Sequence, residues 1–77
     1  MNITEAANWT DQQCAEHLVE ESAGLVAEFG RNLCLIVAAN NIWAESAGNL
    51  HKFAERFRRG DAEATDLVLD AMGRRDA

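Results

Sequence analysis

Residues 33–57 read LCLIVAANNIWAESAGNLHKFAERF, and this stretch holds the most regular apolar pattern of the 77-residue chain. Two series of residues recur at intervals of seven, three positions apart: Leu33, Asn40, Ala47 and Ala54, and Ile36, Trp43, Leu50 and Phe57. This alternating spacing of three and four is typical of a helix that packs along its length against other helices. We therefore predict an all-α protein organised around a long helix over residues 31–59.

The two halves of this long helix differ in composition. Residues 33–44 are apolar on almost every side, as in a helix that is buried on several sides, whereas residues 45–59 are amphipathic. Between the halves, Gly48 could end the helix and Asn49 could cap a new one, or the helix could run through; the sequence leaves both open. Asn40 occupies a heptad core position, where a polar side chain sets register or oligomeric state, although Asn40-Asn41 could instead mark a bend.

A first helix is predicted over residues 11–29. Thr10 and Gln13 have the spacing of a capping box at its start. Gly30 is a natural stop after which the chain doubles back, with one continuous helix through Gly30 as the alternative. The apolar face of this helix comprises Cys14, Ala15, Leu18, Val19, Ser22, Leu25, Val26 and Phe29.

A third helix is predicted over residues 61–73, with Gly60-Asp61 before it and Gly73 as its stop. Its inner stripe comprises Leu67, Val68, Ala71 and Met72. The three helices form a helical hairpin or small bundle in a single domain over residues 1–77. Residues 1–9 and 74–77 are expected to be loose termini.

Charge is segregated along the chain, whose net charge is −6. Residues 1–30 carry net −6, residues 31–60 net +3 and residues 61–77 net −3. The simplest arrangement places the basic end of the long helix between two acidic helices, where ion pairs favour antiparallel packing. An acidic domain of this size is also a poor default candidate for binding the phosphate backbone of nucleic acid.

Met1–Asn8 lacks the basic and apolar regions of a signal peptide, and the longest apolar run is far shorter than the ~20 residues of a membrane span. The two cysteines, Cys14 and Cys34, are too few for a disulfide framework. We therefore expect a soluble cytoplasmic protein with two free thiols.

Possible metal ligands are present but loosely spaced. Cys14, His17 and Glu21 lie within two helical turns, and Cys34 and His51 could complete a zinc site. However, no second closely spaced ligand pair exists, and both cysteines sit at core positions, where a free thiol behaves as a small apolar group. The glycines are isolated, and no nucleophile has both a base and an orienting group nearby. We expect no metal, no cofactor and no enzymatic activity.

The remaining function is binding, and we expect a module that occupies the surface of a partner protein. The acidic side chains that would meet a basic patch are Glu16, Glu20, Glu28, Glu63, Asp66 and Asp70. The alternative is a small nucleic-acid-binding regulator that uses the basic run 51–59 through Lys52, Arg56, Arg58 and Arg59.

In its small size, acidic charge and helicity, the chain resembles the small all-helical orphan proteins of phages and mobile elements, which include anti-CRISPR proteins and other inhibitors of host proteins. The resemblance covers this overall profile and no motif, so no site residue is carried over. It implies an inhibitor whose target surface is a basic, nucleic-acid-binding channel of a host complex.

We also expect a homodimer, because the chain has more apolar surface than three helices can cover. The first helix is expected to cover the seam of Leu33, Ile36 and Trp43, and the third is too short to cover everything else. The face left in water, and therefore the predicted dimer interface, comprises Leu35, Ala38, Ala39 and Ile42.

Overall fold

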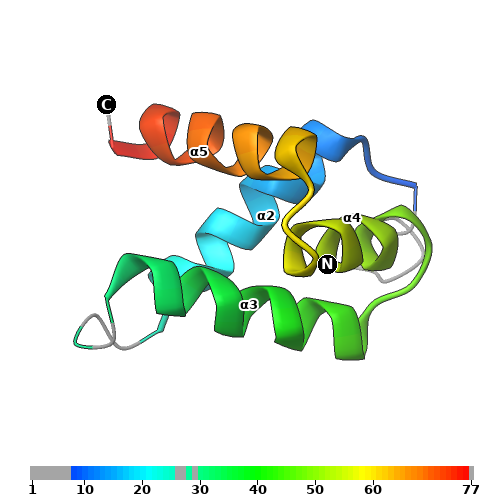
Figure 1. The fold of residues 1–77 in the computed structure, drawn as a ribbon, viewed down its shortest axis with the longest axis horizontal. Coiled ribbons are helices and arrows are strands. Elements are labelled where there is room, and N and C mark those ends of the chain that lie inside the picture. Colours follow the sequence, from blue (N-terminus) through cyan, green and yellow to red (C-terminus); the bar gives the residue numbers. More distant parts are fainter. Residues whose placement is uncertain (1–7, 26–27, 29, 77) are drawn as a thin grey trace.

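The computed structural model of the chain describes residues 8–25, 28 and 30–76, which form four helices. These are α2 (Asp11–Ala23), α3 (Arg31–Glu45), α4 (Gly48–Arg58) and α5 (Ala62–Asp76). In Figure 1, α5 lies along one side of the molecule, α3 lies along the opposite side, and α2 and α4 lie between them. The described residues contain no strand, so the all-α prediction is confirmed and the prediction of three helices is wrong.

Helix α2 begins at the residue that the capping box predicted and ends before the predicted residue 29. The Gln13 backbone N–H donates to the Thr10 hydroxyl at 3.2 Å, and the Thr10 backbone N–H donates to Gln13 Oε1 at 2.9 Å, which completes the capping box. The helix ends at Ala23 with Gly24 as its C-cap, because glycine is a poor helix former. The predicted continuation to residue 29 is therefore wrong. Val26 and Phe29 lie outside the described residues.

The long central helix is broken, and the break precedes the expected position. Ser46 ends α3 by donating its backbone N–H to the Ile42 carbonyl at 2.9 Å, and its hydroxyl donates to the same carbonyl. The alternative with a break, which the sequence left open, placed Asn49 as the cap of the new helix. Instead, Ala47 is the N-cap, and Asn49 lies inside α4 and joins that helix to the start of α2. Its amide Nδ2 donates to the Trp9 carbonyl at 2.7 Å and to Asp11 Oδ1 at 3.0 Å.

Helix α3 buries the face opposite to the predicted one. The heptad residues Leu33, Ile36 and Trp43 are 46%, 51% and 37% exposed. The residues predicted to form an exposed dimer interface are instead buried within the single chain: Leu35, Ala38, Ala39 and Ile42. That interface prediction is wrong, and the break at Ser46 is the physical reason. A heptad carried through a continuous helix keeps one face inward, whereas the break lets α3 and α4 bury different faces.

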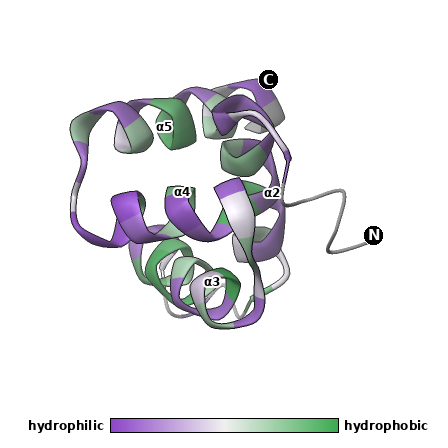
Figure 2. Ribbon diagram, turned by 90° about the vertical axis from the view of Figure 1, so that its right-hand side faces the viewer, coloured by the Kyte–Doolittle hydropathy of each residue, from purple (hydrophilic) through white to green (hydrophobic). Residues whose placement is uncertain are grey.

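In the second half of the heptad, Leu50 and Ala54 point inward, Phe57 is half-buried and Ala47 is exposed. Leu50, Phe53 and Ala54 of α4 are buried with Leu18 of α2 and Val68 of α5 in one apolar core. In Figure 2, hydrophobic residues colour much of α3, whereas the exposed side of α4 is largely hydrophilic. Leu35, Ala39 and Ile42 of α3 belong to the same core, which is therefore built where all four described helices meet.

Helix α5 starts as predicted and ends later. Gly60 has φ 80°, and its backbone N–H and that of Asp61 donate to the Phe57 and Arg56 carbonyls at 3.1 and 3.0 Å, the pattern of a Schellman motif. Asp61 then accepts the Ala64 backbone N–H at 3.0 Å and caps α5. The helix continues through Gly73 to Asp76, so the predicted stop at Gly73 is wrong and residues 74–76 are not a loose tail.

Candidate protein-binding surfaces

Arg56 of α4 is the centre of the internal ion pairs. Its guanidinium lies 2.9 Å from Asp11 Oδ2 at the start of α2, 3.3 Å from Asp61 Oδ2 and 3.8 Å from Glu63 Oε2 at the start of α5. It also stands 5.9 Å from the centroid of the Phe53 ring. The expectation that the basic helix lies between two acidic helices is confirmed at this residue.

The ionisation of both partners reflects this pairing. Hydrogen bonds from Arg56 and Asn49 hold the pKa of the Asp11 carboxyl below its ordinary value of 3.8. The hydrogen bond to Asp11 raises the pKa of the Arg56 guanidinium above its usual value. Both groups are therefore charged at neutral pH, and the pair joins α2 to α4.

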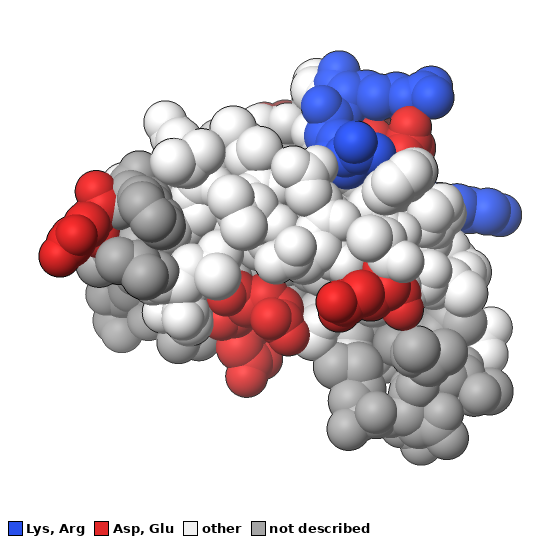
Figure 3. All heavy atoms as spheres, turned by 90° about the horizontal axis from the view of Figure 1, so that it is seen from below, with Lys and Arg blue, Asp and Glu red and all other residues white. Residues whose placement is uncertain are grey.

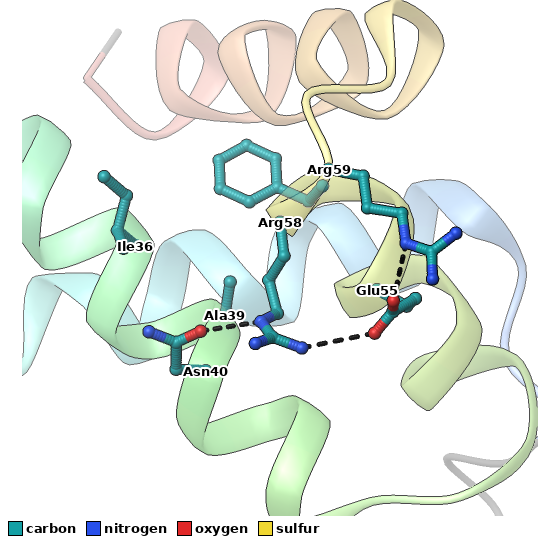
Figure 4. A pocket seen from close by; sticks show the side chains of 7 residues that line it. Ile36, Ala39, Asn40, Glu55, Arg58 and Arg59 are labelled. Atoms are coloured by element: carbon teal, nitrogen blue, oxygen red, sulfur yellow. Dashed lines mark hydrogen bonds and ion pairs between the residues drawn. The ribbon is translucent and has the colours of Figure 1, made fainter.

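Arg58 and Arg59 share Glu55 on the other side of α4 (Figure 4). Arg58 Nε donates to Asn40 Oδ1 at 2.7 Å, and its guanidinium pairs with Glu55 at 3.2 Å and stacks over Trp43 at 4.3 Å. Arg59 Nε lies 2.7 Å from Glu55 Oε1, and its side chain is 79% exposed. Arg58 thus binds α4 to α3, and Glu55 offsets the charge of both arginines.

The residues of the alternative nucleic-acid prediction do not form one free stripe. Arg56 and Arg58 are engaged with residues of other helices, and Arg59 is paired within α4. Lys52 is exposed and makes no ion pair with the residues that the structure describes. Sequence reasoning could not identify these partners, because Asp11 and Asn40 are distant from the arginines along the chain.

The predicted acidic residues are all exposed, and the structure brings some of them together. Helices α2 and α5 pack against each other, and Arg74 bridges them by pairing with Glu16 at 3.3 Å and with Asp70 of its own helix. Glu20 lines the same shallow hollow between the two helices. Glu63 stands beside Arg56, Asp66 is on the outer side of α5, and Glu28 lies apart in the linker between α2 and α3.

An uncharged surface covers the outer side of α3. Figure 3 views the molecule from this side and shows a broad face of uncharged atoms, with Lys and Arg towards the upper right and acidic groups at the left, along the lower part and beside the basic groups. Leu33, Ile36 and Trp43 of α3 are among the large apolar side chains exposed in the described part of the chain. Exposed apolar groups gathered on one face mark an interaction surface more often than single ones do.

Two hollows flank this surface and meet at Ile36 and Phe57. One, of about 320 Å³, lies between α3 and α5 and reaches Leu69, which is 55% exposed. The other, of about 340 Å³, is bounded by Asn40 and Arg58 (Figure 4). Sequence reasoning missed Leu69. The signal was the run Leu67-Val68-Leu69, because three consecutive apolar residues of a helix cannot all face inward.

Both cysteines are buried, and neither forms a disulfide. Burial, reinforced by the nearby charge of Asp11, raises the pKa of the Cys14 thiol to about 11, so it is protonated and unreactive at neutral pH. No three of the described His, Cys, Asp and Glu residues are arranged to hold a metal ion. The His17 side chain instead contacts Glu21 at 3.6 Å and the edge of the Trp9 ring.

None of the described helices is both long enough and apolar enough to span a membrane. Comparisons with protein-family models, curated proteins and solved structures gave no match to this chain. The candidate binding surfaces are the acidic side of α2 and α5 and the uncharged side of α3.

Proposed function

We propose that this protein is a non-enzymatic protein-binding module that occupies a basic surface of a partner protein with the acidic side formed by α2 and α5. The observation that carries the proposal is which charged side chains form ion pairs within the protein and which do not. The arginines of α4 are engaged by internal acids, and Glu16, Glu63 and Asp70 also form ion pairs. Glu20 and Asp66 remain on the acidic side without an ion pair to the described residues.

The electrostatic consequence supports a basic partner. Residues 11–24 contain four acids and neither Lys nor Arg, and α5 follows Asp61 with further acids at Glu63, Asp66 and Asp70. Because the arginines of α4 are paired internally and Arg74 lies near the end of α5, we expect the negative potential to be strongest over α2 and the first half of α5. Such a potential steers a positively charged partner and speeds association more than it adds affinity.

The proposed mode of action is competition for a surface. A basic protein surface that accepts nucleic acid presents the charge that this acidic side complements. By occupying it, the protein would act as an inhibitor of the phage or mobile-element type, anti-CRISPR-like in mode, with no chemical step. The rival function, nucleic-acid binding, retains only Lys52 and Arg59 as outward basic groups of its predicted set.

Matched charge reversals separate the two functions. One variant carries Glu20→Lys with Asp66→Lys and the other Lys52→Glu with Arg59→Glu; Arg56 is left intact because it links three helices. Each is immobilised and exposed to a lysate of cells that naturally express the protein, and captured proteins are purified and tested for direct binding. Circular dichroism and thermal melts verify the fold of each variant.

We expect the basic-pair variant to bind the purified partner as the wild type does and the acidic-pair variant to lose most binding. The wild type should also displace a labelled nucleic-acid duplex from that partner. The opposite pattern, with binding lost only in the basic-pair variant, would overturn the proposal. So would direct binding of the duplex by the wild type that the basic-pair variant abolishes.

A further inference from the structure

The outer side of α3 has the residue spacing of a helix that packs against another helix. In the described part of the chain, no helix covers this side. Leu33, Ile36, Asn40 and Trp43 follow the alternating three and four spacing of coiled-coil core positions, and all four are exposed. The three apolar members are each more than a third exposed. The pattern that predicted internal packing therefore lies on the surface, where a second helix can pack along it.

The distribution of charge indicates which helix can pack against the outer side of α3. The run 32–44 contains no Asp, Glu, Lys or Arg, although the chain carries net −6. Two copies that met through α2 or α5 would oppose their acidic sides. Two copies that meet through α3 bring together the uncharged run 32–44, and the charge of Arg58, which borders this run, is offset by Glu55. Helix α5 lies on the opposite side of the molecule from α3 (Figure 1), so we expect its acidic residues to stay away from the contact.

The polar residue at the middle of the seam fits a symmetric contact. Asn40 Oδ1 accepts the Arg58 Nε–H at 2.7 Å, and the described residues leave its amide Nδ2 without an acceptor. At a two-fold axis a residue meets its own copy, so each Asn40 amide can donate to the free lone pair of the other. A polar residue at such a position selects register and oligomeric state.

We infer that the protein forms a two-fold homodimer in which the outer faces of α3 pack against each other, centred on Asn40. This interface replaces the inward-facing residues predicted from the sequence, and it is independent of the proposed acidic binding side. A seam confined to one helix of 15 residues belongs at the small end of stable interfaces, so we expect a dissociation constant on the order of 10 µM.

Sedimentation equilibrium measures this association directly. Between about 1 µM and about 1 mM, the wild-type mass should rise from 8.5 kDa towards twice that value. Ile36→Glu places a charge in the seam and should weaken association at least ~30-fold, the effect of losing a hot-spot residue. Gln12→Glu adds the same charge at an exposed position of α2 and should associate as the wild type does.

Cross-linking provides a second measurement that needs no loss of stability. Asn40→Cys should form an intermolecular disulfide under mild oxidation, whereas Asp66→Cys on α5 should do so far more slowly. The wild type, whose two cysteines are buried, measures the background rate of cross-linking. A wild type that stays at 8.5 kDa throughout would overturn the inference. So would a folded Ile36→Glu protein that still dimerises, or equal cross-linking of the two cysteine variants.

Discussion

Replacing Arg56 with Gln should destabilise the protein far more than replacing Arg59 with Gln, although both arginines lie at the end of α4 and both form ion pairs. Arg56 joins three helices through Asp11, Asp61 and Glu63, and its side chain is 35% exposed. Arg59 pairs with Glu55 one turn earlier on the same helix, and its side chain is 79% exposed.

The magnitude follows from the geometry. Exposed ion pairs contribute about 0.2–1 kcal/mol each after solvent screening. Arg56 makes two close contacts, at 2.9 and 3.3 Å, and one longer contact at 3.8 Å. We therefore expect Arg56→Gln to cost about 1–2 kcal/mol, which lowers the melting temperature of a domain of this size by about 5–12 °C. For Arg59→Gln we expect about 0.5 kcal/mol or less.

Thermal and urea unfolding, followed by circular dichroism, measure both variants. The double variant Asp11→Asn with Arg56→Gln should cost less than the sum of its single changes by roughly 1 kcal/mol, because the pair is lost only once. Added salt should reduce the difference between wild type and Arg56→Gln. Equal destabilisation by Arg56→Gln and Arg59→Gln, or additive effects in the double variant, would refute the structural role of Arg56.

Three further results are expected. The pKa of Asp11 is lower in the folded chain than its ordinary value of 3.8. The contribution of Asp11 to stability is therefore complete above pH 3.8 and is lost as the pH falls below that value. Unfolding measured as a function of pH should show a smaller loss of stability in acid for Arg56→Gln than for the wild type. Gly60→Ala should destabilise the protein by about 1–2 kcal/mol, because the φ of 80° at this position disfavours a residue with a Cβ. Gly73→Ala should stabilise it by up to about 1 kcal/mol, because Gly73 lies inside α5 with open space for a Cβ. Urea unfolding measures both changes. Cys14, whose pKa is raised to about 11, should react with iodoacetamide at pH 8 (about 3 units below that value) only after denaturation; rapid labelling of the folded protein, located by mass spectrometry, would contradict its burial.

Local signals in the sequence determined where several elements begin and which faces of two helices are buried. Thr10 and Gln13 predicted the start of α2, and Gly60-Asp61 predicted the start of α5. These signals are reliable because each hydrogen bond of these caps joins residues only three to five positions apart. The segregation of charge likewise indicated that α4 pairs with acidic neighbours, since it depends only on the net charge of each segment.

The choice of which face of α3 is buried depended on the tertiary structure. Residues 33–44 are apolar almost all round, so burying either face removes a similar apolar area from water. The buried face contains the small residues Ala38 and Ala39 beside Leu35 and Ile42, and the exposed face carries the bulkier Trp43. The break at Ser46 allows α3 to turn this face towards α2 and α4, and close packing against both helices leaves the heptad seam exposed. Periodicity alone cannot make this choice.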